Sequence, residues 1–175
     1  MDFKDKIVES LGGLENLTRK IPGYSGYKEK EMRREADRLL RAKIAGDFGA
    51  QVQRLVDMQG QLVAGGSLEL LEQATALDDA VRRLQTFVDR IERAAMGYAG
   101  FFDAVKVKEE QLDALYEFDS NLLAQIDGVT AAVDAVQAAI DSGEGLAEAI
   151  AVAKRIAGDV NHLFNQREQV ITGSL

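Results

Sequence analysis

The chain has 175 residues, which is the size of a single domain. Its formal net charge is −8, so general nucleic-acid binding is not expected, because the phosphate backbone would be repelled. The chain has no cysteine, which excludes disulfides, thiolate metal sites and a thiol nucleophile. No signal peptide and no run of about 18 apolar residues stands out. We therefore expect a cytoplasmic protein, or one attached peripherally to a membrane.

Residues 1–26 are predicted to form an amphipathic arm and linker ahead of the main domain, residues 27–175. Gly12 and Gly13 would divide the arm into two short helical pieces. Its regularly spaced apolar residues could share one face of these pieces, and they are Phe3, Ile7, Leu11, Leu14 and Leu17.

The first long helix of the main domain is predicted to begin after Gly26 and to reach about Val63. Its apolar residues recur mostly at spacings of four, so the apolar stripe drifts around the helix. Three glycines could bend this helix or let a neighbour approach closely, and they are Gly46, Gly49 and Gly60. The stripe comprises Met32, Ala36, Leu40, Ile44, Phe48, Val52, Leu55 and Leu62.

The helical signal is strongest after Ser67, which follows two glycines and is predicted to cap the next helix. Apolar residues recur there at alternating spacings of four and three, as in left-handed coiled coils. Gly97 and Gly100 are the points at which this helix could kink or break. The seam comprises Leu70, Ala74, Leu77, Val81, Leu84, Val88, Ile91, Ala95, Tyr98, Phe102 and Val105.

Two further segments repeat this spacing. The first begins near Glu109 and ends at Ser142 and Gly143, and its seam comprises Leu112, Leu115, Asp119, Leu122, Ile126, Val129, Val133, Val136 and Ile140. The second ends before Gly173, and its seam comprises Ala149, Ala153, Ile156, Val160, Leu163, Arg167 and Val170.

The connections between these predicted helices are short, which makes successive helices antiparallel neighbours. We therefore predict an all-α fold, namely an antiparallel up-down four-helix bundle of long helices with a short helical N-terminal arm.

The segment from Ile21 to Ala45 reads IPGYSGYKEKEMRREADRLLRAKIA. It resembles a signature of an uncharacterised family of bacterial all-helical proteins. The resemblance implies a bacterial, helical protein, and it transfers no activity and no catalytic residue.

This segment is also basic. Residues 19–43 carry nine Lys or Arg against four Asp or Glu, whereas residues 44–175 carry ten against twenty-one. A predicted stripe of cations along one helix face could hold phosphates, anionic lipid headgroups or an acidic protein surface. Acidic residues at helical pairing distance leave a self-paired, solvated face as the alternative. The candidate partner-binding residues are Tyr24, Tyr27, Lys30, Arg34, Arg38 and Arg41.

A polar core position is predicted at Asp119, which occupies the seam between Leu115 and Leu122. An ionised carboxylate there must find a partner or shift its pKa. It could pair with Arg167, which also occupies a seam position, and so fix the helix register. It could instead lie at a solvated level of the bundle or line a ligand site.

No catalytic residue, cofactor or metal is predicted. Metal sites of four-helix bundles use Glu residues and Glu-x-x-His pairs, whereas this chain has one histidine, His162, with Asp159 three residues before it. His162 lies off the apolar seam and is expected at the surface. The motifs of serine hydrolases, P-loop proteins and dinucleotide-binding folds are absent from the sequence.

Three functions remain open on the sequence. The first is a non-enzymatic interaction or scaffold protein, which binds a protein partner or a second copy through the arm and the basic stripe. The second is a membrane-surface adaptor that binds anionic lipids, although the balanced charge of the arm is unlike that of most such anchors. The third is an enzyme or small-molecule binder with a site near Asp119.

Overall fold

The computed structural model describes residues 25–104 and 109–172, with side chains described for residues 39–93 and 121–166. These residues form four α-helices, and no strand occurs among them. The prediction of an all-α four-helix bundle is confirmed. The helices are α2 (Ser25–Ala64), α3 (Leu68–Ala104), α4 (Glu109–Ser142) and α5 (Leu146–Thr172).

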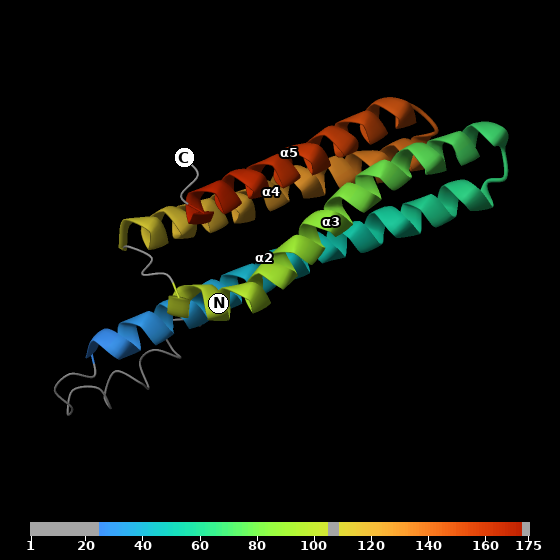
Figure 1. Cartoon of the computed structure of the whole chain (residues 1–175). Coiled ribbons are helices and arrows are strands. Elements are labelled where there is room, and N and C mark those ends of the chain that lie inside the picture. The colour runs from blue at the N-terminus through green and yellow to red at the C-terminus, as the bar shows by residue number, and fades with distance from the viewer. Residues whose placement is uncertain (1–24, 105–108, 173–175) are drawn as a thin grey trace, which may run out of the picture. The chain divides into compact units, whose positions relative to one another are not determined.

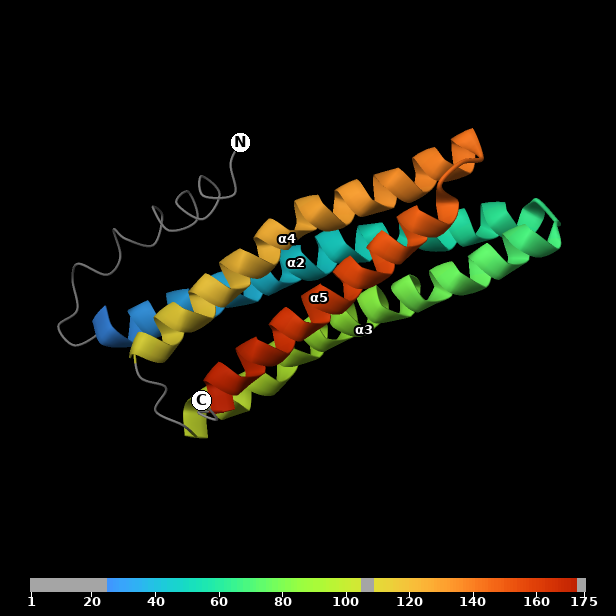
Figure 2. The ribbon, with the colours of Figure 1, turned by 90° about the horizontal axis from the view of Figure 1, so that it is seen from above.

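The chain divides into two units, residues 1–40 and residues 41–175, and the bundle belongs to the second. Two helical hairpins, α2–α3 and α4–α5, lie against each other with both turns at the same end (Figures 1 and 2). Successive helices therefore run in opposite directions, as the short connections predict. Helix α5 packs closely along both α3 and α4.

The order of the helices around the bundle is α2, α3, α5, α4, so that α3 and α5 are parallel neighbours (Figures 1 and 2). Helices α3 and α4 follow each other in the chain but occupy diagonal corners. The expectation that all successive helices are neighbours is therefore wrong for this pair. The apolar seams are the same in either arrangement, so their spacing does not select between the two.

The two hairpin turns are built from a helix cap and from glycines with positive φ. The Leu70 main-chain N–H donates to Ser67 Oγ at 3.1 Å, so Ser67 is the N-cap that was predicted. Gly66 has a φ of 73°, and in the second turn Gly143 and Gly145 have φ values of 73° and 71°. Side chains at these three positions would be strained, because the left-handed region crowds a Cβ.

Replacing Gly66 by Ala should lower the free energy of unfolding by about 1 kcal/mol, because Ala disfavours a positive φ. The same change at Gly60 should have the opposite sign. Gly60 is exposed within α2, and no atom lies within 4 Å of the Cβ that the change would add. Ala there should raise the free energy of unfolding by about 0.5–1 kcal/mol. Urea denaturation of both variants measures this, and equal effects would contradict the assigned turn.

The core contains most of the described seam residues that the spacing predicts. Most of the described seam residues of α3 and α4 are buried, and the half-buried ones are Leu70, Val81, Ile126 and Ile140. The most deeply buried of the predicted residues are Ile44, Phe48, Leu55, Leu77, Ile91, Leu122 and Val136, each with 0% exposure. The seam of α2 is therefore confirmed over the described side chains, and the seams of α3 and α4 are confirmed at most of their positions.

The predicted seam of α5 is partly wrong. Ala153 and Val160 are buried, but Ala149, Ile156 and Leu163 are only half-buried. The buried face instead includes the residue after each of these three, namely Ile150, Ala157 and Phe164. Helix α5 contacts two neighbours, α3 and α4, so its buried face is wider than one seam and is rotated by about one residue.

The close approach predicted at the glycines of α2 and the break predicted in α3 are wrong. No atom lies within 4 Å of a Cβ built on Gly46 or Gly49, so neither admits a close neighbour. Helix α3 continues without a break through Gly97 and Gly100 to Ala104. Within the described part of the chain, no helix has a stretch that is long and apolar enough to cross a membrane.

Candidate functional site

The predicted basic stripe begins in the first turns of α2. Helical backbone runs from Ser25 through Tyr27, Lys30, Arg34 and Arg38, so these residues belong to one continuous helix. Their side chains lie outside the described set, and Tyr24 lies outside the described residues altogether.

Arg41 is a correction to the predicted stripe. Its side chain is only 4% exposed, so it is a buried cation and not part of a solvent-facing surface. The reason is its position, since Arg41 lies three residues before Ile44 and four before Ala45, which are both buried. The step of three after Arg38 moves Arg41 toward the core face of α2.

The predicted polar pair lies in helical backbone, with Asp119 in α4 and Arg167 in α5. The side chains of both lie outside the described set. His162 is exposed on α5, as predicted. No group of three or more His, Cys, Asp or Glu residues is placed to hold a metal ion in the described part of the chain.

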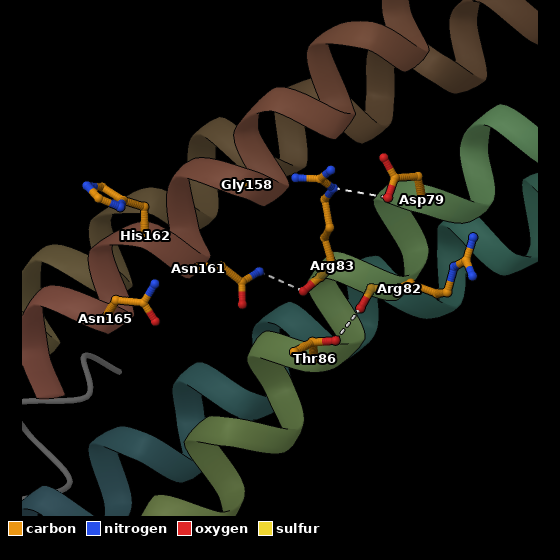
Figure 3. A pocket seen from close by; sticks show the side chains of 8 residues that line it. All are labelled: Asp79, Arg82, Arg83, Thr86, Gly158, Asn161, His162 and Asn165. Atoms are coloured by element: carbon orange, nitrogen blue, oxygen red, sulfur yellow. Dashed lines mark hydrogen bonds and ion pairs between the residues drawn. The ribbon is translucent and has the colours of Figure 1, made fainter.

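A polar groove that the sequence analysis missed runs between α3 and α5, with a volume of about 410 Å³ (Figure 3). It lies between two helices that are not consecutive in the chain. No sequence pattern within either helix predicts the groove, because the groove depends on which helices become neighbours. Its lining residues are Asp79, Arg82, Arg83 and Thr86 of α3 and Gly158, Asn161, His162 and Asn165 of α5.

An ion cluster that joins the two helices lies at one end of the groove. Arg83 Nε donates to Asp79 Oδ1 at 3.1 Å, and Lys154 Nζ lies 3.3 Å from Asp79 Oδ2. The hydrogen bond from Arg83 is the main cause that lowers the pKa of Asp79. Burial acts in the opposite sense, and Lys154 lowers this pKa further. Two cations therefore share one ionised carboxylate.

Asn161 joins the helices through their main chains. Its Nδ2 donates to the carbonyl oxygen of Arg83 in α3 at 2.7 Å and to that of Ala157 in α5 at 3.0 Å. This fixes the carboxamide, and Figure 3 shows its oxygen turned away from these bonds. One turn further along α5, Asn165 Oδ1 accepts from Arg90 Nη2 at 2.6 Å, and the Arg90 guanidinium lies 4.4 Å from the centre of the Phe164 ring.

The side chains that line the groove supply hydrogen bonds and charge. Figure 3 shows His162 directed away from Arg83 and from Asp79, so these residues form no acid–base pair. Thr86 Oγ1 donates to the carbonyl oxygen of Arg82 at 2.7 Å, and no described residue is bonded to it as a base. The groove therefore offers hydrogen bonds and charge, without a nucleophile and base in contact.

Comparison with protein-family models, with curated proteins and with solved structures finds no match for this chain.

Proposed function

We propose that this chain is a non-enzymatic helical interaction or scaffold protein of the cytoplasm, which acts through its N-terminal arm and its basic helix stripe. The observation that carries the proposal is the continuous helix from Ser25 to Ala64. Residues four apart on a helix differ by about 40° around its axis, so Lys30, Arg34 and Arg38 share one face. Because Arg41 is buried, the proposed stripe comprises three cations rather than four.

In residues 41–175, the second unit of the chain, charged side chains join the helices to one another, which supports this role. The ion pairs between α2 and α4 and between α5 and α3 are structural, since they join helices within the bundle. None of the described side chains forms a metal-binding group. A bundle held together in this way can present a partner-binding helix without chemistry of its own.

Replacing both Arg34 and Arg38 by Gln should weaken binding of an anionic partner and leave the helix content nearly unchanged, because Gln is a good helix former. Binding by the unchanged protein should also fall as salt rises, since exposed charges are screened within about 10 Å at 0.1 M. The measurement is recovery of a protein partner from cells of the source organism at two salt concentrations. Vesicles rich in an anionic lipid provide a second arm, which tests the membrane-surface alternative.

A matched control exists in α3 and α5. Arg93 and Arg155 are exposed, and neither makes a hydrogen bond or ion pair with the described residues. Replacing both by Gln gives the same change of charge at a different surface. Equal loss of binding in the two double variants would indicate a general charge effect. Unchanged, salt-insensitive binding by the Arg34 and Arg38 variant would show a self-paired, solvated face instead of a stripe that binds.

A further inference from the structure

The groove between α3 and α5 carries an excess of positive charge on a chain that is acidic as a whole. Asp79 is shared by Arg83 and Lys154, so this cluster has a surplus of one positive charge. Arg82 is paired separately, with Asp78 at 2.9 Å, and does not change the surplus. At contact distance the cluster therefore attracts an anion, whereas the net charge of −8 repels anions at long range.

Hydrogen-bond donors also remain available in the groove. Only Nε of the Arg83 guanidinium is bonded to a described residue, so its two Nη groups are left to donate. The Arg83 side chain is 49% exposed, and Figure 3 shows it extending from α3 toward α5 at Gly158. Asn165 uses its oxygen on Arg90, which leaves its amide nitrogen to donate as well. A guanidinium with two free Nη groups fits the two oxygens of a carboxylate.

Gly158 lies where the Arg83 side chain meets α5. No atom lies within 4 Å of a Cβ built on Gly46 or Gly49, whereas Gly158 has a charged neighbour. A Cβ on Gly158 would lie 3.3 Å from Arg83 Nη1, which is tighter than ordinary contact. The missing side chain therefore lets the guanidinium lie against the backbone of α5.

The shape of the groove selects the kind of ligand. Pockets for small molecules are mostly apolar and enclose most of the ligand surface. Here the groove is open to solvent, and the Asp79 and Lys154 side chains are 35% and 38% exposed. An open groove with charged side chains between two parallel helices instead suits a polypeptide segment that crosses it and places one side chain inside.

We propose that the α3–α5 groove binds an acidic side chain of a partner polypeptide, with Arg83 as its main ligand and Lys154 as a second cation. This inference adds a second binding surface to the proposed interaction role. It uses none of the residues of the basic stripe, so either proposal can fail without the other.

The test is an NMR titration of the isotope-labelled full chain with a peptide of ten glutamates at low salt. Amide shifts should concentrate at residues 79–86 and 158–165. Replacing Arg83 by Gln should weaken this binding by about five-fold, the amount expected for one exposed charge pair. The same change at Arg93, an exposed arginine outside the groove, should have a smaller effect.

Two further variants separate this site from general charge attraction. Replacing Asp79 by Asn should strengthen binding, because it releases both Arg83 and Lys154 for the peptide. This gain should exceed the gain from the same change at Asp127, an exposed carboxylate of α4. Replacing Gly158 by Leu should weaken binding without changing the charge, since the new side chain occupies the space of the guanidinium. Thermal melts of each variant confirm that it remains folded.

The outcomes are distinct. Groove-centred shifts that are lost with Arg83 and gained with the Asp79 variant would support the proposal. Equal effects of the Arg83 and Arg93 variants would overturn it. Shifts that disappear only when Arg34 and Arg38 are both replaced would also overturn it, and would place the anion site on the basic stripe.

Discussion

Replacing Phe87 by Ala should lower the free energy of unfolding by about 3–5 kcal/mol, as large aromatic truncations in cores do. The Phe87 side chain has 0% exposure. The centre of its ring lies 4.7 Å from the centre of the Phe48 ring and 5.9 Å from that of the Phe164 ring. These pairs have the tilted and edge-on geometries that aromatic rings favour. It therefore joins α2, α3 and α5, and its removal would leave a cavity that no single helix can close. Urea denaturation measures the change.

Two neighbouring changes test this interpretation. Replacing Phe87 by Leu should cost less, because Leu refills part of the cavity. Replacing the adjacent Thr86 by Ala should alter the free energy of unfolding by less than about 0.5 kcal/mol, since Thr86 is exposed and bonds only within its own helix. Equal costs for the Phe87 and Thr86 variants would show that α3 packs through a different face.

Phe87 also shows the limit of what the sequence could predict about the core. The spacing of four and three correctly predicts Leu77, Leu84 and Ile91 as buried. A single seam of this kind contains two residues in seven, but a helix with two packed neighbours buries a third position in each repeat. Phe87 lies three residues after Leu84 and four before Ile91, on the flank of the seam. Which flank is buried depends on the neighbours, and these are not encoded in the spacing.

The same argument explains why the buried face of α5 and the groove between α3 and α5 were not predicted correctly. The predicted seam of α5 contains Ile156 and Leu163, whereas Ala157 and Phe164 are buried more deeply. The side of α5 that is buried follows from its contacts with both α4 and α3, of which α3 is its parallel neighbour. The short connections favour contacts between successive helices and give no signal for the pair α3 and α5. The groove lined by Arg83 and Asn161 could not be predicted for the same reason.

The candidate residues were placed correctly where the position depends on one helix alone, and incorrectly where burial against other helices decides it. His162 was placed correctly at the surface, because its offset from the seam is a property of the helix alone. Arg41 was placed incorrectly, because regular spacing of cations was given more weight than its distance from Ile44 and Ala45. Charge spacing describes which residues share a face, while burial decides whether that face meets solvent. The apolar residues downstream of Arg41 carried the signal that would have identified it.

Replacing Leu122 by Ala should lower the free energy of unfolding by about 2–5 kcal/mol. Leu122 has 0% exposure and lies on the face of α4 that also buries Val129, Val133 and Val136. Truncation at Val133 removes fewer atoms from the same face and should cost less. Both variants should shift the midpoint of urea denaturation without changing its slope, because the surface exposed on unfolding is nearly the same.

Leu68 provides the matched control for Leu122. It stands at the start of α3 with 75% of its surface exposed, so the same truncation there removes little buried area. Its effect on the free energy of unfolding should lie within about 0.5 kcal/mol. A difference of at least about 1.5 kcal/mol between the two leucine variants is therefore expected from burial alone. If both variants unfolded at the same urea concentration, α4 would have to turn a different face to the core. The assignment of Val133 and Val136 to the core would then also be wrong.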